Sequence, residues 1–451
     1  MKSNSEKSIS GFSKLSKRGK IKWIASNFFK DPESVMRELT SYWHSNEDQQ
    51  KILDGFSENT ITNFPMPYGV APNFVINGET YCIPMVIEES SVVAAASNAA
   101  KFWMDRGGFK TSVLCTEKVG QLHFTWKGPK DLLINNFEKI KEQLLQSVNA
   151  MTKNMEDRGG GISRIELLDK TEELDNLYQL QCYFETCDSM GANFINSILE
   201  KFGFELRDLI KKSEELKPYA EDFEVIMAIL SNYTPNCIVR AEVSCDVKEL
   251  GGVSTHFSAQ EFASRFKTAV DIARIDPFRA TTHNKGIYNG IDAVVLATGN
   301  DFRAIEACGH SYAAKDGQYR SLSHCTIEND VFRFWLDIPL AVGTVGGLTS
   351  LHPMAKRSLE LLGNPSASEL MQIIASTGLA QNFGAVRSLV TTGIQKGHMR
   401  MHLLNILHQM EATEKEIKRA LVHFNTEIVS FVSVRDFLDS LRRDKGIKIV
   451  N

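Results

Sequence analysis

The sequence predicts an α+β fold of more than one domain, and three patterns support this prediction. Segments with apolar residues at helical spacing alternate with short strand-like segments along the 451 residues. The strand-like segments gather between residues 110 and 185, whereas helical patterns dominate on either side. Beyond residue 393 the chain becomes charged and helical again. A chain of this length is expected to contain two or three domains.

Composition argues against several classes of protein. A formal net charge of −4 gives no bulk field that attracts nucleic acid. No apolar run is long enough for a membrane span, and the basic first 22 residues resemble a solvated tail rather than a secretory signal. The eight cysteines are scattered without a CxxC pair, so we expect reduced thiols in the cytoplasm.

A metal site is not expected either. The eleven histidines form no HExxH motif and no spacing that pairs them with cysteines. His398 and His402 are four residues apart, but no carboxylate lies between them.

The N-terminal third is expected to be helical at 21–60, with a proline-rich extended loop at 63–73 and a strand at 80–86. The carboxylates Glu88 and Glu89 then precede an alanine-rich segment at 92–100. Alanine has the highest helix propensity, and its small side chain allows close packing, so this helix should be buried. Acidic residues at this position also complement the helix dipole, which is an alternative to any catalytic role.

The central third predicts a small inserted domain. We expect a hairpin at 110–127, a helix at 129–152, strands at 165–168 and 179–185, and a helix from Asp188. This order resembles the ferredoxin-like arrangement. No GxGxxG follows any strand, so a Rossmann fold is not indicated. Asp188 is either the cap of its helix or part of an anion site there.

Residues 276–306 contain the densest group of polar side chains. From about His283 the pattern becomes helical, and Lys285 shares one stripe with Asn289 and Asp292. Residues 297–300 break this helix, and Asp301 begins the next, so Lys285 and Asp301 are candidates to meet across the break. Spacing alone favours a solvated lysine and a capping aspartate.

The remaining elements complete the prediction. We expect a strand at 332–340, a tight turn at 343–347 and two helices at 366–377 and 379–392. A capping box at Thr413 and Glu416 should begin a C-terminal helix, and Ser433 should begin another.

Several of these segments resemble one family. Residues 279–304 read RATTHNKGIYNGIDAVVLATGNDFRA, which resembles the signature of 3-hydroxy-3-methylglutaryl-coenzyme A (HMG-CoA) reductase in its soluble, bacterial class II form. Further matches, in the family's order, are IEESSVVAAAS at 87–97, DSMGAN at 188–193, GTVGG at 343–347, AQNFGA at 380–385 and GIQKGHM at 393–399.

The resemblance implies a domain division. A large helix-rich α/β substrate domain would comprise residues 1–114 and 223–392, with a small ferredoxin-like, non-Rossmann nucleotide-binding domain inserted at 115–222. A helical flap would occupy 393–451. The family builds its active site between two subunits, so a homodimer, or a multiple of it, is implied.

The resemblance also implies the reaction, which is the two-step hydride reduction of the HMG-CoA thioester to mevalonate and coenzyme A in isoprenoid biosynthesis. Lys285 would stabilise negative charge on the carbonyl oxygen, and Asp301 would hold that lysine. His398 would protonate the leaving thiolate, and Glu89 would protonate the aldehyde. Ser90 departs from the proline that is usual in the family but leaves Glu89 in place.

Binding residues follow from the same motifs. The substrate would contact Ser91 and Arg279, while Asn289 and Gln381 would support the lysine. The cofactor would lie against Asp188, Met190, Gly191 and Asn193.

Nucleotide preference depends on Arg164. NAD-using members carry an acidic residue near this position, so a basic one beside Ser163 favours NADPH, with NADH possible, and the biosynthetic direction. The alternative is that Arg164 is a solvated strand residue. Two functional alternatives stay open, namely mevalonate breakdown with NAD and a catalytically silent coenzyme A-binding protein of the same fold.

Overall fold

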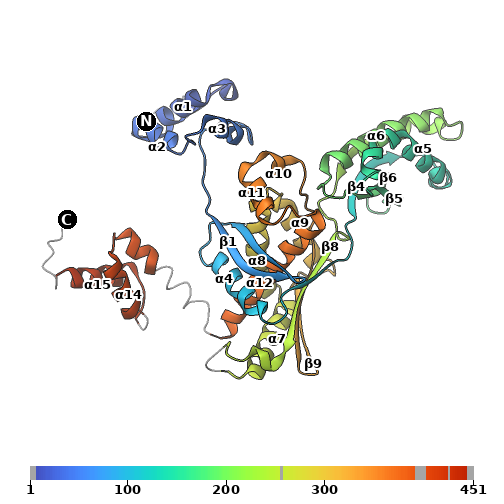
Figure 1. Cartoon of the computed structure of the whole chain (residues 1–451). Helices are drawn as coiled ribbons and strands as arrows, with labels where there is room; N and C mark the ends of the chain where they lie inside the picture. The colour runs from blue at the N-terminus through green and yellow to red at the C-terminus, as the bar shows by residue number, and fades with distance from the viewer. Residues whose placement is uncertain (1–6, 254–256, 392–402, 425–426, 444–451) are drawn as a thin grey trace.

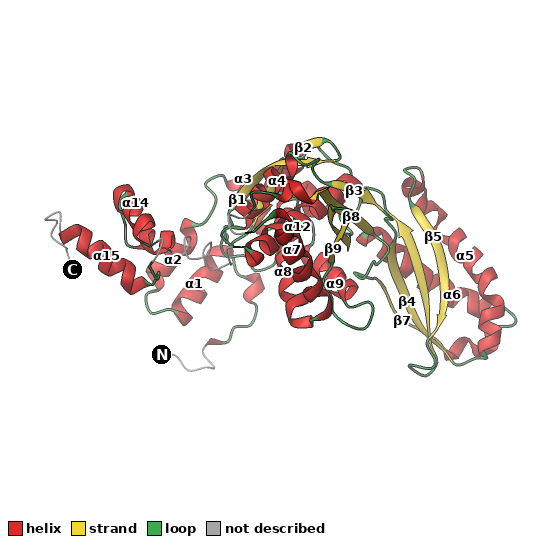
Figure 2. Cartoon of the chain, turned by 90° about the horizontal axis from the view of Figure 1, so that it is seen from below, coloured by secondary structure: helices red, strands yellow, loops and turns green. Residues whose placement is uncertain are grey.

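The structure is a computed structural model that describes residues 7–253, 257–391, 403–424 and 427–443. Figure 1 shows a central body with a smaller sheet extending to one side and two groups of short helices on the opposite side. Figure 2 shows the same arrangement from below. Within the described residues, no helix has the length and apolar character that a membrane crossing requires.

Three helices precede the central body, and each begins with a side-chain cap. They are α1 (Lys17–Phe28), α2 (Pro32–Ser41) and α3 (Glu47–Asp54). A hairpin of β1 (Tyr68–Ile76) and β2 (Glu79–Val86) follows. The loop predicted at 63–73 is therefore wrong from Tyr68 onward. Pro72 is tolerated in β1 because it falls at an irregularity in the pairing, where no ladder hydrogen bond is lost.

The central body is built on an antiparallel sheet with the order β3-β8-β10-β9. Its strands are β3 (Lys110–Val113), β8 (Ile238–Asp246), β9 (Ser323–Glu328) and β10 (Val331–Pro339). Buried side chains of this sheet form one apolar core with those of four helices. These helices are α4 (Val92–Met104), α7 (Ala259–Ile275), α8 (Pro277–Ala297) and α12 (Ala367–Val390).

The helix predicted from His283 begins six residues earlier. Asp276 caps α8 by accepting the backbone N–H of Phe278, and Pro277 is the first helical residue. Proline suits that position because its fixed φ is helical and its missing N–H would have had no partner. Lys285 therefore lies well inside α8 rather than at its start.

The two helices predicted at 366–377 and 379–392 are one continuous helix, α12. Gly378 does not end the helix but allows α12 to pack closely against α8. A Cβ at this position would lie 2.8 Å from Cγ1 of Ile291 on α8. On the facing helix, a Cβ at Gly290 would lie 2.6 Å from the carbonyl oxygen of Thr377. The glycines allow α8 and α12 to cross in close contact, which brings their polar residues together.

The smaller sheet is antiparallel with the order β5-β6-β4-β7. Its strands are β4 (Lys118–Trp126), β5 (Gly161–Asp169), β6 (Leu177–Glu185) and β7 (Phe223–Leu230). The helices α5 (Lys130–Glu156) and α6 (Ala192–Lys212) cover one face and share a second apolar core with it. The hairpin predicted at 110–127 is wrong, because β3 pairs with β8 in the central sheet whereas β4 pairs with β6 and β7.

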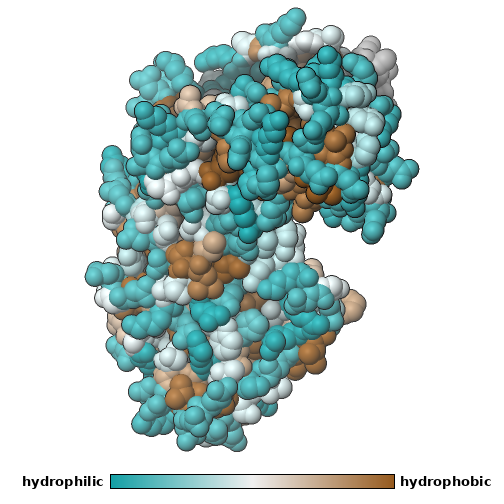
Figure 3. Space-filling model, turned by 90° about the vertical axis from the view of Figure 1, so that its right-hand side faces the viewer, coloured by the Kyte–Doolittle hydropathy of each residue, from teal (hydrophilic) through white to brown (hydrophobic). Residues whose placement is uncertain are grey.

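The face of the smaller sheet that lacks helices carries a chain of polar side chains from β4, β5 and β6. Gln121 donates to Gln181, which donates to the hydroxyl of Tyr183, and this hydroxyl donates to Glu166. Figure 3 views the molecule from this end and shows a largely hydrophilic surface with scattered apolar patches. The exposed apolar side chains of Met227 and Ile229 on β7 lie on the same face, so it is polar over β4 to β6 and apolar at its β7 edge.

Short helices connect the larger elements. They are α9 (Phe302–Ala313), α10 (Gly347–Leu351) and α11 (Pro353–Leu361), with 3-10 turns at Phe12–Lys14, Lys217–Asp222 and Val247–Leu250.

The C-terminal helices α14 (Glu414–His423) and α15 (Phe431–Arg443) share a third apolar core with a helical segment at 403–409. The capping box of Thr413 and Glu416 is confirmed at the start of α14. The predicted start at Ser433 is wrong, since α15 begins at Phe431 and Ser433 bonds back to Ser430.

Candidate functional site

The ends of α4, α8 and α12 enclose an open cavity of about 1150 Å³. Six residues predicted to act on the substrate or in catalysis line it. They are Glu89, Ser91, Arg279, Lys285, Asn289 and Gln381. They come from three segments far apart in sequence, so the fold brings together what motif matching identified separately.

Lys285 and Glu89 form an ion pair in this cavity. The Nζ of Lys285 donates to Oε2 of Glu89 at 2.6 Å, and Nδ2 of Asn289 reaches the same oxygen at 3.4 Å. Lys285 and Asn289 are four residues apart on α8, so both side chains point to the same side of the helix. The lysine side chain retains 60% of its exposure, which leaves its ammonium group open to a ligand.

Asp301 does not contact Lys285 within the chain. Because α8 continues to Ala297, about 18 Å of helix separates Lys285 from its end. Asp301 instead caps α9 through the N–H groups of Arg303 and Ala304 and pairs with the Arg303 guanidinium at 3.1 Å. Burial opposes ionisation of Asp301, but its hydrogen bonds to Arg303 and Ala304 outweigh burial and lower the pKa.

Arg279 gives the cavity its second cation. Its guanidinium forms no ion pair with a carboxylate of the described chain, and desolvation lowers its pKa. Ser91 lies at the start of α4 in the left-handed region, with φ of 74°, and its side chain does not cap the helix. A partly buried arginine next to a free hydroxyl suits a bound anion such as a carboxylate.

A buried polar chain forms the floor of the cavity, and the sequence did not predict it. His283 lies 2.7 Å from the hydroxyl of Ser323, which donates to Oδ1 of Asn382 at 2.8 Å. Burial lowers the pKa of His283 to about 3, so the ring is neutral. Its Nδ1 and the Oε1 of Gln381 have no protein partner among the described residues. Because the three partners come from distant segments, no local spacing could have shown the chain.

The predicted cofactor loop lies at the opposite end of α12. Asp188 accepts the N–H of Ala367, the first residue of α12, at 2.7 Å. The capping role considered for Asp188 on α6 is wrong, because Gly191 occupies the N-cap position with φ of 91°. Asn193 is exposed in the first turn of α6, and Met190 faces a small internal cavity.

The loop at 188–193 contacts the turn at 343–347. These two motifs, which are far apart in the sequence, therefore form one structural unit. The N–H of Thr344 donates to the carbonyl of Asp188 at 2.9 Å, and Ser189 pairs with Val345. At Gly343 a Cβ would lie 2.5 Å from the nitrogen of Met190. Glycine is therefore needed there for close approach.

Arg164 lies on the helix-free side of the smaller sheet, where it stacks over the ring of Tyr183 at 3.6 Å. It also approaches Glu117 at 3.3 Å and Glu166 at 3.4 Å. The hydroxyl of Ser163 lies 3.1 Å from Glu117. Its charge is therefore partly balanced by carboxylates, although 47% of the side chain remains exposed.

His398 lies outside the described residues. Groups of histidine, cysteine and carboxylate side chains suited to a metal ion are absent from the described part of the chain.

Comparison with known proteins identifies the family. Residues 20–403 match the family model described as hydroxymethylglutaryl-coenzyme A reductase. The 3-hydroxy-3-methylglutaryl-coenzyme A reductase of Archaeoglobus fulgidus is 37% identical over 422 residues, which are 92% of this chain and 89% of that protein. A probable enzyme of the same name from Borreliella burgdorferi is 33% identical over 90% of this chain and 89% of that protein.

Solved structures agree with the sequence comparisons. A class II 3-hydroxy-3-methylglutaryl-CoA reductase from Streptococcus pneumoniae, solved bound to NADPH in open conformations, has a TM-score of 0.69 and 33% identity. The match covers 90% of this chain and 98% of that one. A second structure of the Streptococcus pneumoniae reductase gives a TM-score of 0.70 at 33% identity over 96% of this chain and 100% of that one. These matches confirm the mixed α and β fold and the resemblance predicted from the motifs. The chain belongs to the hydroxymethylglutaryl-coenzyme A reductase family of oxidoreductases.

Proposed function

We propose that this chain reduces the thioester of HMG-CoA to mevalonate and coenzyme A, with NADPH as reductant. The observation that carries this proposal is the ion pair of Lys285 and Glu89 inside a cavity that also contains Arg279. A carbonyl reduction needs a fixed cation beside the oxygen that gains charge and a proton donor within reach. The cavity offers both, together with an arginine for a carboxylate.

The substrate is anchored by its free carboxylate. Arg279 is suited to this role because the described residues offer its guanidinium no carboxylate and desolvation strengthens the interaction with an anion. Ser91 adds a hydroxyl donor to the lining of the same cavity. Gln381 supports the substrate from the floor, since its Oε1 has no protein partner in the described chain.

Two reductions follow in sequence. NADPH supplies a hydride in each. In the first, the thioester carbon gains the hydride, and Lys285 stabilises the oxygen that becomes negative. The carbon–sulfur bond then breaks, and His398 gives the departing thiolate a proton. In the second, the aldehyde carbon gains a hydride, and Glu89 donates a proton to its oxygen after the carboxylate has taken up that proton from solvent. Each turnover thus consumes two hydrides and two protons and releases one thiol and one alcohol.

The nucleotide is held by the smaller sheet and the loop at 188–193. The strand order β5-β6-β4-β7 with α5 and α6 on one face supports a ferredoxin-like insert, and because β7 (Phe223–Leu230) belongs to this sheet, the insert extends beyond the expected end at residue 222. The first turn of α6 offers backbone N–H groups, since Gly191 at its N-cap has no side chain to occupy them. The Streptococcus pneumoniae structure bound to NADPH supports the same cofactor, and Arg164 is the candidate for its 2′-phosphate.

The active site is shared by two subunits of a homodimer. Lys285 and Asp301 are separated by about 18 Å of helix plus a turn within one chain, so Asp301 reaches the lysine only from a second copy. About 21 Å of α12 also separates Gln381 from Ala367, where the cofactor loop is attached. The separate apolar core of the C-terminal helices supports a flap at 393–451 that closes over the site.

A stoichiometry measurement tests the proposal. Purified protein is supplied with HMG-CoA and NADPH, and nucleotide oxidation is measured alongside release of the coenzyme A thiol. Two NADPH molecules oxidised for each thiol are expected. If no thiol is released and nucleotide is not oxidised, the chain is a silent binding protein. If the enzyme reduces HMG-CoA only with NADH, the proposed cofactor is wrong, and if it acts only on mevalonate with NAD, it works in the degradative direction.

A further inference from the structure

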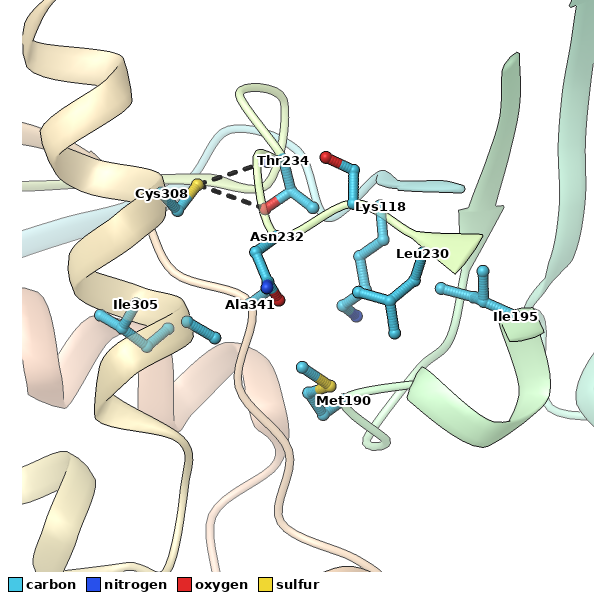
Figure 4. Close-up of a pocket in the computed structure, with 11 residues that line it drawn as sticks. Lys118, Met190, Ile195, Leu230, Asn232, Thr234, Ile305, Cys308 and Ala341 are labelled. Atoms are coloured by element: carbon cyan, nitrogen blue, oxygen red, sulfur yellow. Dashed lines mark hydrogen bonds between the residues drawn. The ribbon is translucent and has the colours of Figure 1, made fainter. Parts of the chain in front are cut away.

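A second cavity, of about 340 Å³, lies where the smaller sheet meets the central body (Figure 4). Residues from both parts line it. From the smaller sheet and its loop come Lys118, Met190, Ile195 and Leu230, and from the central body come Ile305, Cys308 and Ala341. Ser231, Asn232 and Thr234 also line the cavity, so its wall is partly polar, and one charged side chain is found among its described lining residues.

Lys118 is that charged group. It is the first residue of β4, only 4% of it is exposed, and Figure 4 shows its amino end directed into the cavity towards Met190. Its Nζ donates to the hydroxyl of Thr186 at 2.5 Å and approaches the carbonyl of Ser189 at 3.4 Å. Both partners are neutral. Burying an ammonium group without a counter-charge is costly, so such residues are retained for function more often than for stability.

The carboxylates near Lys118 are committed to other donors. Glu185 accepts the N–H of Cys187 at 3.0 Å and the hydroxyl of Thr116. Asp188 accepts the N–H of Ala367. Within the described residues, no ion pair includes Lys118, and its charge therefore remains available to an anion.

Lys118 is bonded to the segment that contains the predicted cofactor motif. Thr186, which accepts from Lys118, donates to the carbonyl of Ser189 at 2.6 Å. The hydroxyl of Ser189 accepts the N–H of Gly191, the N-cap of α6, at 3.0 Å. A Cβ at Gly191 would lie 2.5 Å from Cγ2 of Thr186, so this loop is closely packed. Lys118 thus holds the loop in place through its hydrogen bonds. Its positive charge adds to the partial positive charge at the N-terminus of α6.

We propose that Lys118 is a positioning residue for the nicotinamide nucleotide. It holds loop 186–191 in the shape that receives the nucleotide diphosphate, and the diphosphate supplies the negative charge that the protein does not. This inference rests on the proposed function, because it assumes that the nucleotide binds at this loop. A diphosphate is favoured over the 2′-phosphate because the charge of Lys118 lies near the start of α6 rather than on the open sheet face with Arg164.

The test is Lys118→Met, which keeps the length of the side chain and removes the charge. We expect NADPH to bind at least ~10-fold more weakly, since a charge-assisted contact contributes about that factor. The binding of NADH should weaken by the same factor, because both nucleotides carry the diphosphate. The KM for HMG-CoA should stay within about twofold, and the melting temperature should be unchanged or higher, because a buried charge is replaced by an apolar group.

Two further variants complete the design. Lys118→Arg restores the charge and should recover part of the NADPH affinity. Lys127→Met makes the same change at an exposed lysine just past the other end of β4 and should leave binding unchanged. Nucleotide binding is measured by fluorescence titration at two salt concentrations, and the salt dependence should be weaker in Lys118→Met than in the wild type.

Unchanged NADPH affinity in Lys118→Met would overturn the inference. So would a variant whose melting temperature falls and whose affinity for HMG-CoA weakens together with that for NADPH, because Lys118 would then be a general structural residue. A wild type that binds no nucleotide would instead contradict the proposed function, whatever the variants do.

Discussion

Lys285, Glu89 and Arg279 are the residues on which the proposed chemistry depends. The ion pair holds the lysine ammonium towards the cavity, and the hydrogen bond from Asn289 fixes the shared carboxylate oxygen. An ammonium group that is fixed before the reaction stabilises developing negative charge without reorganisation. In the proposed reaction the glutamate has two uses in turn: as an anion it positions Lys285, and once it has taken up a proton it can donate that proton to the aldehyde oxygen.

Removing the lysine tests its part in this account. Lys285→Ala should lower kcat by at least ~10²-fold, because one contact to a transition-state oxyanion typically contributes that much. The KM for HMG-CoA should change less, since Arg279 still binds the carboxylate. Steady-state kinetics on folded variant protein gives both constants. A variant that turns over at nearly the wild-type rate would show that Lys285 is not catalytic.

Arg164 is the residue proposed to select NADPH over NADH. Its contacts with Glu117 and Glu166 compete with a 2′-phosphate, but its exposure leaves room for one. Arg164→Asp should lower kcat/KM for NADPH relative to NADH by at least ~10-fold, because a cation is replaced by an anion beside the phosphate. Arg207→Asp, at an exposed arginine of α6, is the matched control. Equal effects on both nucleotides would exclude a selective role.

For single residues, the sequence predicted most of the side chains that line the cavity, but it did not predict that Lys285 pairs with Glu89. Six residues predicted to act on the substrate or in catalysis lie together in the structure because each came from a long motif. Spacing suggested that Lys285 and Asp301 could meet across the break after α8, but the part of α8 between Lys285 and Ala297 keeps them apart within one chain, and Glu89 pairs with the lysine instead. The buried chain of His283, Ser323 and Asn382 was missed, since its members share no local pattern.

Among the elements, α8 and α12 position the site by crossing at Gly290 and Gly378. The sequence indicated both helices but placed a break at Gly378, because glycine more often ends a helix than serves close packing. The prediction of a hairpin at 110–127 was wrong for a related reason. Alternation predicts strands but does not tell which sheet each strand joins, and here the chain passes from one sheet to the other after Val113.

The carboxyl groups of Asp292 on α8 and Glu306 on α9 lie close together and should make the free energy of unfolding depend on pH. Burial raises the pKa of Asp292 to about 8, and the nearby charge and hydrogen bond of Glu306 act in the same direction. Tyr288 faces the pair from α8 and His310 from α9. The folded chain keeps a proton that the unfolded chain releases near pH ~4, so stability should fall as pH rises from about 4 to about 8.

Replacing the aspartate should remove this dependence. Asp292→Asn stays neutral in both states, so its melting temperature at pH 8 should exceed that of the wild type by roughly 2 °C or more. Near pH 5 the two proteins should melt closer together. Thermal unfolding of both proteins across this range measures the effect, with Asp316→Asn, at an exposed loop position, as the control. A constant difference at all pH values would mean that Asp292 is ionised in the folded protein.

At the scale of the whole molecule, the proposed active site is shared between two copies of the chain. The smaller sheet and the C-terminal helices each have their own apolar core, so each is suited to move or to meet a second copy as a unit. The sequence could suggest such an assembly only through family resemblance, because periodicity reports the faces of an element and not its neighbours in another subunit. The length of α8 supplies the physical argument.

Subunit mixing tests this arrangement most directly. Lys285→Ala and Asp301→Asn should each be nearly inactive alone, and asparagine keeps the helix cap of α9. When the two variants are unfolded and refolded together, one site in each mixed dimer combines an intact Lys285 with an intact Asp301. Activity should then return to about a quarter of the wild-type level, as random pairing of two-fold symmetric subunits predicts. Mixtures that stay as inactive as the separate variants, although mixed dimers form, would contradict a shared active site.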